Sequence, residues 1–326
     1  MIEPTASLEE AERTLRTGGL AVVPTETVHG LAADAANGTA VARIFAAKGR
    51  PSFNPLIAHV ADLAMAERTG ALDDVARDLA SRFWSGPLTL VVPLRDNAPV
   101  HALATAGLAT VALRRPRGPM AELARRLGRP LVAPSANVSG RISPTRTAHV
   151  MADLAPRLDP ARDVVLAEST MGEAGEVGLE STIVSLAAEP TLLRPGGIPR
   201  EAIEAALGGH PLREAGDGAV AAPGMLASHY APRGTVRLEA THADPDEFVI
   251  GYGPSHRAGG GAGRFELSLT GDPAEAARNL FAALHAANAT GASRIAVEPI
   301  PNEGLGEAIN DRLRRAAAPD RTPIDG

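Results

Sequence analysis

The stretch between Gly208 and Gly234 divides this chain of 326 residues into two parts. Glycine, proline, alanine and scattered charges dominate the stretch, and neither helical nor strand spacing of apolar residues holds. Such a composition is typical of a linker. A chain of this length is also expected to contain about two domains, at roughly 100–200 residues each. We therefore predict one domain over residues 1–207, an interdomain linker over 208–234 and a second domain over 235–326.

Before this linker, short apolar runs alternate with amphipathic segments. Strands are expected at 20–23, 55–60, 88–94, 110–114, 131–133, 164–167, 182–186 and 191–194. Helices are expected at 7–17, 39–48, 73–83, 120–127, 147–154 and 200–207. Because the alternation keeps no strict strand–helix–strand rhythm, the predicted fold class is α/β with a twisted, mixed sheet.

After the linker, strands are expected at 236–238, 248–251, 265–269 and 295–297. They enclose a long helix at 272–288, and a last helix follows at 305–317. The glycines at 259–261 indicate a flexible loop. This part is predicted to be a smaller, Rossmann-like α/β domain.

The composition excludes several classes of protein. Cysteine is absent, which removes disulfides, thiolate nucleophiles, zinc fingers and iron–sulfur clusters. No segment approaches the ~20 apolar residues of a membrane span, and the N-terminus lacks an apolar signal core, so we expect a soluble, cytoplasmic protein without membrane partners. The motifs of phosphate loops, serine-hydrolase elbows and zinc peptidases are also missing. The nine histidines are scattered, so no metal site is expected on the protein itself.

Basic residues are unevenly distributed. Residues 101–150 carry eight arginines and one acid, Glu122, whereas the whole chain has a net charge of −6. This block could focus an anionic ligand, or it could pair with the acidic stretch 151–220. Lys48 is the only lysine beside 31 arginines. It is either a leftover on a solvated face or a residue whose function arginine cannot replace.

The neighbours of Lys48 favour a function. The segment KGRPSFNP places Lys48 and Arg50 two residues apart, beside a glycine and followed by two prolines. Lysine supplies a compact charge and arginine a planar fork, which together suit a polyphosphate. Both cations would also complement the dipole at the end of the preceding helix. We predict a phosphate contact here.

Hydroxyl and amide side chains follow two other predicted strands. The segments PTETVHGL, which begins at Pro24, and PSANVSG, which begins at Pro134, offer hydroxyls, an amide and backbone N–H groups to a small polar ligand. The alternative is that each is an ordinary polar turn. Tyr230 lies at the end of the linker in SHYAP, where it is either a lid over a ligand or an anchor that packs the linker onto a domain.

Read together, these segments resemble the L-threonylcarbamoyladenylate synthase family in its two-domain form, with a YrdC-like catalytic domain. The match covers nearly all of residues 1–205 and the end of the linker. Its pieces occur in family order: PTETVHGL, KGRPSFNPLIAHV, FWSGPLTLV, TVALR, PSANVSGRISPT, GLESTIV, LLRPGGI and SHYAP. The resemblance implies a nucleotidyltransferase that makes threonylcarbamoyl-AMP and pyrophosphate from L-threonine, bicarbonate and ATP. A downstream enzyme would transfer the threonylcarbamoyl group to the adenosine at position 37 of tRNA.

The resemblance also implies the roles of individual residues. The L-threonine part of the site would be lined by Thr27, His59, Arg114, Ser135 and Ser181. The nucleotide part would be lined by Arg50, Asn54, Thr110, Asn137, Thr145, Arg194 and Tyr230. Lys48 would meet the phosphates, which makes Lys48 and Arg50 the predicted catalytic residues, and Mg²⁺ is expected with ATP. These roles agree with the chemistry of the side chains, since Arg114 can clamp a carboxylate and a phosphoryl transfer needs positioning more than an acid–base pair.

Three positions depart from the family pattern. His29 stands where a tyrosine is usual, and Ser85 where a proline is usual. Residues 167–176, AESTMGEAGE, replace a shorter glycine-rich segment before Ser181, so the local geometry there is the least determined part of the predicted site.

Three alternatives to a synthase remain open. An RNA-binding YrdC-like module without synthase activity would suit the basic block, although only 9 of 326 residues are aromatic. A carbamoyltransferase of the hydrogenase-maturation type would bring zinc-binding cysteines, which this chain lacks. A non-catalytic relative would not be expected to keep the KGR, SAN and EST segments intact.

Overall fold

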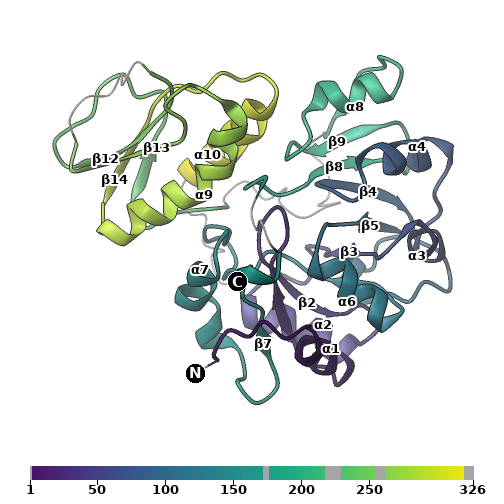
Figure 1. The fold of residues 1–326 in the computed structure, drawn as a ribbon. Coiled ribbons are helices and arrows are strands. Elements are labelled where there is room, and N and C mark those ends of the chain that lie inside the picture. The colour runs from purple at the N-terminus through teal and green to yellow at the C-terminus, as the bar shows by residue number, and fades with distance from the viewer. Residues whose placement is uncertain (1, 172–175, 217–228, 255–260, 319–326) are drawn as a thin grey trace, which may run out of the picture. The chain divides into compact units, whose positions relative to one another are not determined.

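The computed structural model describes residues 2–171, 176–216, 229–254 and 261–318. Residues 217–228 of the predicted linker, part of the 167–176 segment and two glycines of the predicted flexible loop lie outside these residues. The chain forms two compact units (Figure 1). One unit consists of residues 1–138 and 144–225, and the other of residues 139–143 and 226–326.

The first unit is built on a ten-stranded sheet in the order β10-β9-β8-β4-β5-β3-β6-β2-β1-β7 (Figure 1). The strands are β1 (Ala21–Val23), β2 (Gly30–Asp34), β3 (Ile57–His59), β4 (Leu88–Pro93), β5 (Thr110–Arg114), β6 (Leu131–Val132), β7 (Val164–Val165), β8 (Thr182–Ser185), β9 (Thr191–Arg194) and β10 (Arg213–Glu214). β3 and β5 are parallel, whereas β4 and β5 are antiparallel. The sheet is therefore mixed, and the predicted fold class is confirmed.

Some helices of the first unit begin at a polar capping side chain. The helices are α1 (Leu8–Arg16), α2 (Gly38–Lys48), α3 (Leu63–Thr69), α4 (Asp74–Phe83), α5 (Ala102–Thr105), α6 (Pro119–Leu127), α7 (Thr147–Asp153) and α8 (Arg200–Ala206), of which α6, α7 and α8 have no capping side chain among the described residues. Short 3₁₀ turns follow at Ala155–Arg157 and Glu168–Met171. Ser7 caps α1 and Asn37 caps α2, since each side chain accepts a hydrogen bond from a backbone N–H three residues later. Gly49 ends α2 in the left-handed conformation.

The two faces of the central strands have different surroundings. One face joins the main apolar core, to which Leu90 and Leu113 belong. The other face carries a small separate cluster of buried side chains, namely Ile57, Val91, Ala112 and Ile183. Because side chains alternate along a strand, Thr110 and Arg114 share the face of Ala112 on β5. This second face therefore has polar residues at both ends of a short apolar floor.

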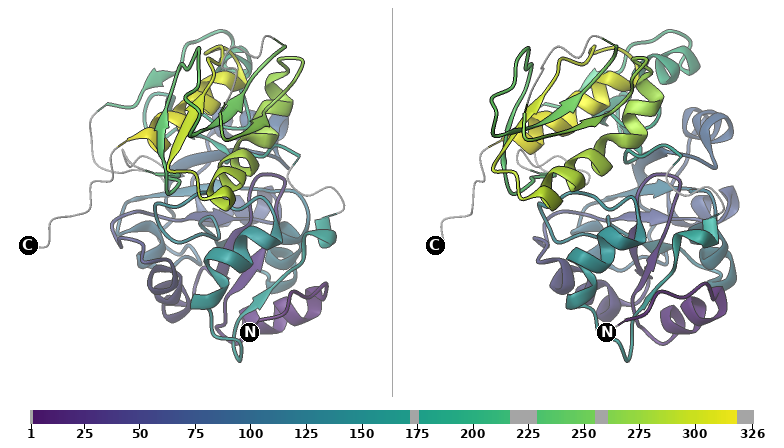
Figure 2. Two further views of the ribbon diagram at one scale, coloured as in Figure 1. Left: turned by 90° about the vertical axis from the view of Figure 1, so that its left-hand side faces the viewer. Right: turned by 60° about the vertical axis from the view of Figure 1, so that its left-hand side comes forward.

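The second unit has a four-stranded parallel sheet in the order β11-β14-β12-β13. Its strands are β11 (Thr235–Arg237), β12 (Glu247–Gly251), β13 (Gly263–Glu266) and β14 (Arg294–Val297). Helices α9 (Pro273–Thr290) and α10 (Leu305–Ala317) lie side by side in this unit (Figure 2). The smaller α/β domain is thus confirmed as a fold.

A five-residue segment of the preceding chain, Ser139–Ser143, groups with the second unit. The carbonyl of Gly140 accepts a hydrogen bond from the N–H of Ala231 at 2.9 Å. The ring of His285 on α9 lies 3.1 Å from the carbonyl oxygen of Ser143. Two segments of the chain therefore form the second unit, residues 139–143 and residues 226–326.

No helix in the described part of the chain is long and apolar enough to cross a membrane.

Candidate active site

The carboxyl ends of β3 and β5 bring two predicted residues together. The strands are parallel and in register, so that His59 pairs with Arg114. Both side chains are almost fully buried. A cation and an imidazole therefore stand side by side at one end of the second face of the sheet.

Arg114 is held by the loop that follows β1. Its Nη2 donates to Oε1 of Glu26 at 2.8 Å and to Oγ1 of Thr27 at 2.9 Å, and its Nε points to the carbonyl of Gly86 at 3.4 Å. Both carboxylate and guanidinium are at most 5 % exposed. The sequence did not assign Glu26 a role.

The hydroxyl of Thr27 can accept a hydrogen bond from a ligand but has no proton left to give. Thr25 Oγ1 donates its proton to the carbonyl of Val28 at 2.7 Å. The hydroxyl proton of Thr27 must therefore point to Thr25 Oγ1, 2.9 Å away, since each hydroxyl has only one. Thr27 thus offers acceptor capacity to a group that carries hydrogens, such as an ammonium or a hydroxyl.

His59 is neutral at physiological pH. Burial and the nearby positive charge of Arg114 lower the pKa of its imidazole to about 3. Its Nδ1 is buried and makes no hydrogen bond within the described residues. The ring therefore keeps one polar atom for a ligand.

Ser181 and Arg194 form a second polar group at the N-terminal end of β8. The hydroxyl of Ser181 lies 2.7 Å from that of Thr89 on β4. Arg194 Nη2 donates to the carbonyl of Ser181 at 2.8 Å and to its hydroxyl at 3.2 Å. Gly196 packs against the same backbone, and a Cβ there would lie 2.4 Å from the nitrogen of Thr182. The glycine of the LLRPGGI motif is therefore required by close packing.

Arg50, Asn54 and Thr110 lie at the opposite end of the same strands. Thr110 precedes Arg114 by four residues, which corresponds to about 13 Å along a strand. Arg50 donates to the carbonyl oxygens of Asn54 and Pro55 at 3.2 and 3.0 Å. The Oδ1 of Asn54 is buried and has no partner among the described residues. Arg50, Asn54 and Thr110 of the predicted nucleotide group thus lie away from Arg114, whereas Arg194 of the same group contacts Ser181, which belongs to the predicted L-threonine group.

Lys48 is buried and ties the end of α2 to the segment after β6. Its Nζ donates to the carbonyl oxygens of Ser135 and Asn137, at 2.6 and 2.5 Å. Burial and the positive charge of Arg50 hold the pKa of the ammonium group well below its usual value. An ammonium group has three donors, so one remains beyond these two hydrogen bonds. Lys48 is therefore not a leftover on a solvated face.

The segments that contain His29 and Ser135 are joined by backbone hydrogen bonds. Gly30 and Ser135 form an antiparallel bridge, and the carbonyl of His29 accepts from the N–H of Ala136 at 2.7 Å. The N–H of His29 donates to the carbonyl of Pro144 at 2.9 Å. Thr145 follows directly, and its N–H points to the ring of His149 at 3.3 Å. The departure at position 29 therefore lies inside the predicted site.

Tyr230 belongs to the second unit, where it is 1 % exposed. Its ring contacts those of His229 and Phe281, with centroids 4.1 and 5.4 Å apart, and the guanidinium of Arg312 lies 5.5 Å from its centroid. Its backbone is left-handed, with φ 64°. An anchor role within the second unit is thus visible, and the contact with a nucleotide stays a prediction.

Glu26 is the residue that the sequence analysis missed. It lies within PTETVHGL, but the motif was interpreted through its hydroxyls. The available signal was an acid between two threonines directly after a buried strand. Such a carboxylate needs a buried cation as partner.

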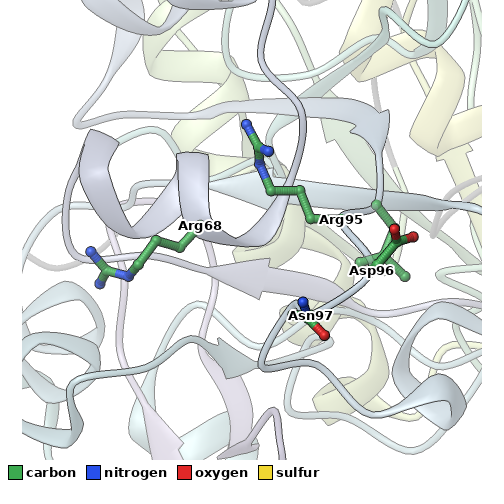
Figure 3. Close-up of a pocket in the computed structure, with 5 residues that line it drawn as sticks. Arg68, Arg95, Asp96 and Asn97 are labelled. Carbon is green, nitrogen blue, oxygen red and sulfur yellow. The ribbon is translucent and has the colours of Figure 1, made fainter.

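Another pocket in the first unit contains none of these residues. It has a volume of about 320 Å³ and is lined by Arg68, Leu94, Arg95, Asp96 and Asn97 (Figure 3). The side chains of Arg68 and Arg95 point in different directions in Figure 3, so they do not converge on one ligand.

Protein side chains offer little to a metal ion. No group of three or more acidic or histidine side chains with metal-binding geometry occurs in the residues that the structure describes. The predicted nucleotide residues are cations, amides and hydroxyls, whereas Mg²⁺ prefers carboxylate and phosphate oxygens. Cations, amides and hydroxyls suit phosphate oxygens better than they suit a metal ion.

Comparisons with known proteins cover nearly the whole chain. A family model for Sua5, YciO and YrdC proteins, described as "Telomere recombination", matches residues 13–196. The model of the threonylcarbamoyl-AMP synthase C-terminal domain matches residues 198–318. The threonylcarbamoyl-AMP synthase of Pyrococcus abyssi is 39% identical over 93% of this chain and 92% of its own length, and that of Bacillus subtilis is 37% identical over 95% and 92%.

The fold agrees with that of a solved relative. A crystal structure of P. abyssi Sua5 complexed with L-threonine has a TM-score of 0.82 and 37% identity, and the match covers 95% of this chain and 94% of that one. Fold and matches together define a two-domain α/β enzyme of the nucleotidyltransferase type. The chain belongs to the threonylcarbamoyl-AMP synthase family.

Proposed function

We propose that this enzyme makes threonylcarbamoyl-AMP and pyrophosphate from L-threonine, bicarbonate and ATP. L-threonine would bind at the Arg114 end of the sheet face, and the nucleotide at the Arg50 end. The product would serve a downstream enzyme that transfers the threonylcarbamoyl group to the adenosine at position 37 of tRNA, in the cytoplasm.

The observation that carries this proposal is the set of free groups around Arg114. A relative of similar fold was crystallised with L-threonine. In this chain, Arg114 offers a positive charge. The hydroxyl of Thr27 has its own proton committed to Thr25 and can accept a hydrogen bond, and His59 Nδ1 is buried without a partner among the described residues. Threonine carries a carboxylate for the cation, and an amine and a hydroxyl that can hydrogen-bond to Thr27 Oγ1 and His59 Nδ1.

The reaction would then proceed by positioning. The amine of threonine attacks the carbon of bicarbonate, which yields a carbamate and water. A carbamate oxygen attacks the α-phosphorus of ATP, and pyrophosphate leaves in line with it. Arg50 and the remaining donor of Lys48 would stabilise the negative charge of the phosphates, and Mg²⁺ would be part of the substrate, bound to ATP.

The basic block gives little support to the RNA-binding alternative. Arg114, Arg117 and Arg129 pair with Glu26, Glu176 and Asp34, which all lie outside the block. Arg125 and Arg126 pair with carboxylates as well. Most of the excess charge that the sequence shows is thus neutralised in the folded protein, and less of it remains for RNA phosphates.

The test is a pyrophosphate assay with the pure protein, ATP and magnesium. Pyrophosphate release is expected only when both L-threonine and bicarbonate are present. L-2-aminobutyrate, which lacks the hydroxyl, should be a much poorer substrate, since a site that hydrogen-bonds a hydroxyl rejects analogues without it. Release that does not depend on threonine would contradict the proposal.

A further inference from the structure

We propose that Glu26 is a positioning residue, whose carboxylate holds the guanidinium of Arg114 so that its Nη1 is kept for the carboxylate of the substrate. This inference rests on the proposed function, because it takes Arg114 as the group that binds L-threonine. Glu26 itself would not touch the substrate.

The carboxylate of Glu26 is fixed at both oxygens. Oε1 accepts from Arg114 Nη2 at 2.8 Å, and Oε2 accepts from the backbone N–H of Arg117 at 3.1 Å. The backbone carbonyl of Glu26 accepts from the N–H of Val177 at 2.9 Å. The side chain is 1 % exposed. A carboxylate held in this way can impose an orientation on its partner.

This orientation leaves two N–H groups of Arg114 without a partner among the residues that the structure describes. A guanidinium has five N–H donors, one at Nε and two at each Nη. Both hydrogens of Nη2 are committed, one to Glu26 and one to Thr27. The hydrogen of Nε points to Gly86. No hydrogen bond from Nη1 occurs within the described part of the chain, so its two N–H groups are the ones left for a ligand.

The charge of Glu26 matters as much as its geometry. An isolated buried guanidinium would be costly, and the carboxylate offsets that cost. The pair is neutral before substrate binds. An amino acid, which carries both signs, therefore fits this end of the site better than a simple anion, which would add an uncompensated negative charge.

A purely structural role would have a different signature. Since the carboxylate of Glu26 also accepts a hydrogen bond from the backbone N–H of Arg117, its loss would loosen this segment and lower stability. Because the same loop carries Thr27, such loosening would lower L-threonine affinity together with the midpoint of urea denaturation. The decisive measurement is therefore the L-threonine affinity, relative to that for ATP, in a variant whose urea midpoint stays close to that of wild type.

The experiment measures binding of L-threonine and of ATP to the full chain by calorimetry, for wild type, Glu26→Gln and Glu26→Asp. Gln keeps the size but not the charge of the side chain. We expect L-threonine affinity to fall at least about tenfold in Glu26→Gln, with ATP affinity within about twofold of wild type. Glu26→Asp, which keeps the charge, should recover part of the loss and serves as the readout if the Gln variant does not fold.

Glu122→Gln is the matched control, because Glu122 pairs with Arg125 and Arg126 on the surface of the same unit. It should change neither affinity. Unchanged L-threonine affinity in Glu26→Gln, or an equal fall for L-threonine and ATP, would overturn the positioning role. Failure of the proposed function would give a different result, because the wild-type protein would then release no pyrophosphate in response to L-threonine.

Discussion

At the scale of single residues, Lys48 is both the one lysine of the sequence and a buried hydrogen-bond donor in the structure. Its rarity predicted a function, and its position beside Arg50 indicated phosphates. The structure adds two hydrogen bonds from Nζ to the carbonyl oxygens of Ser135 and Asn137. These bonds connect the end of α2 with a segment that carries one predicted L-threonine residue and one predicted nucleotide residue.

Replacing Lys48 by methionine should therefore lower the affinity of the protein for both L-threonine and ATP. Without the ammonium group, the carbonyl oxygens of Ser135, which is partly buried, and Asn137, which is buried, lose this donor, at a cost of about 1–3 kcal/mol for each group. L-threonine affinity, measured by calorimetry without ATP, should fall together with ATP affinity. The surface variant Arg68→Met is the control. If Lys48 only contacted phosphates, L-threonine would bind to Lys48→Met as well as to wild type.

His59 should make the folded protein sensitive to acid. The pKa of its imidazole is about 3 in the folded protein, below the usual 6.5. Between these values the unfolded chain binds a proton that the folded chain does not, so stability is full above pH 6.5 and falls as the pH drops towards 3. The slope approaches about 1.4 kcal/mol per pH unit. Urea denaturation at pH 7.5 and 4.5 should show a loss about 2–3 kcal/mol larger for wild type than for His59→Gln. Equal losses would contradict a neutral, buried imidazole.

The residues of the candidate site were predictable from the sequence to different degrees. Motif position named Arg114, Lys48 and Arg194, because few residue types can replace a buried cation. Glu26 was missed, since its partner lies 88 residues away in the chain and only the fold brings the two together. Likewise, no local pattern shows that the hydroxyl proton of Thr27 is committed to Thr25.

At the scale of elements, long periodic segments were predicted, whereas some short ones, such as β2 and α5, were missed. The predicted helices at 39–48 and 120–127 correspond to α2 and α6. Strand β2 was missed because all five of its residues are buried, so that no alternation of polar and apolar residues marks it. Helix α5 is a single turn of four residues, too short to show a period. Parallel pairing of β3 with β5, which aligns His59 with Arg114, needs the three-dimensional fold.

The glycine that ends α2 allows a test at this scale. Gly49 and Gly128 both end a helix in the left-handed conformation, with φ of 61° and 73°. An alanine at either position should cost about 1–2 kcal/mol, because a Cβ disfavours this conformation. Urea denaturation should therefore show similar losses for Gly49→Ala and Gly128→Ala. Only Gly49 lies between Lys48 and Arg50, so only Gly49→Ala should raise the KM for ATP. The same rise in Gly128→Ala would show that the effect is one of general stability.

At the scale of the whole molecule, each unit has its own sheet and its own buried side chains. The first unit holds the predicted L-threonine residues, and the second holds Tyr230. Ion pairs also join segments that are far apart in the sequence, since Arg126 of α6 pairs with Glu9 and Glu12 of α1. The sequence showed a basic block, but the distribution of its partners could not be predicted, since they come from several elements.

The two substrates should therefore protect different parts of the chain. L-threonine at a hundred times its dissociation constant stabilises its binding unit by about 2.7 kcal/mol. Hydrogen exchange should show this protection in β3 and β5 of the first unit, and not in α9 and β14 of the second. Addition of ATP should extend protection to the backbone around Tyr230, because that residue is predicted to contact the nucleotide. Equal protection of both units by L-threonine alone would show that the amino acid, and not the nucleotide, engages the second unit.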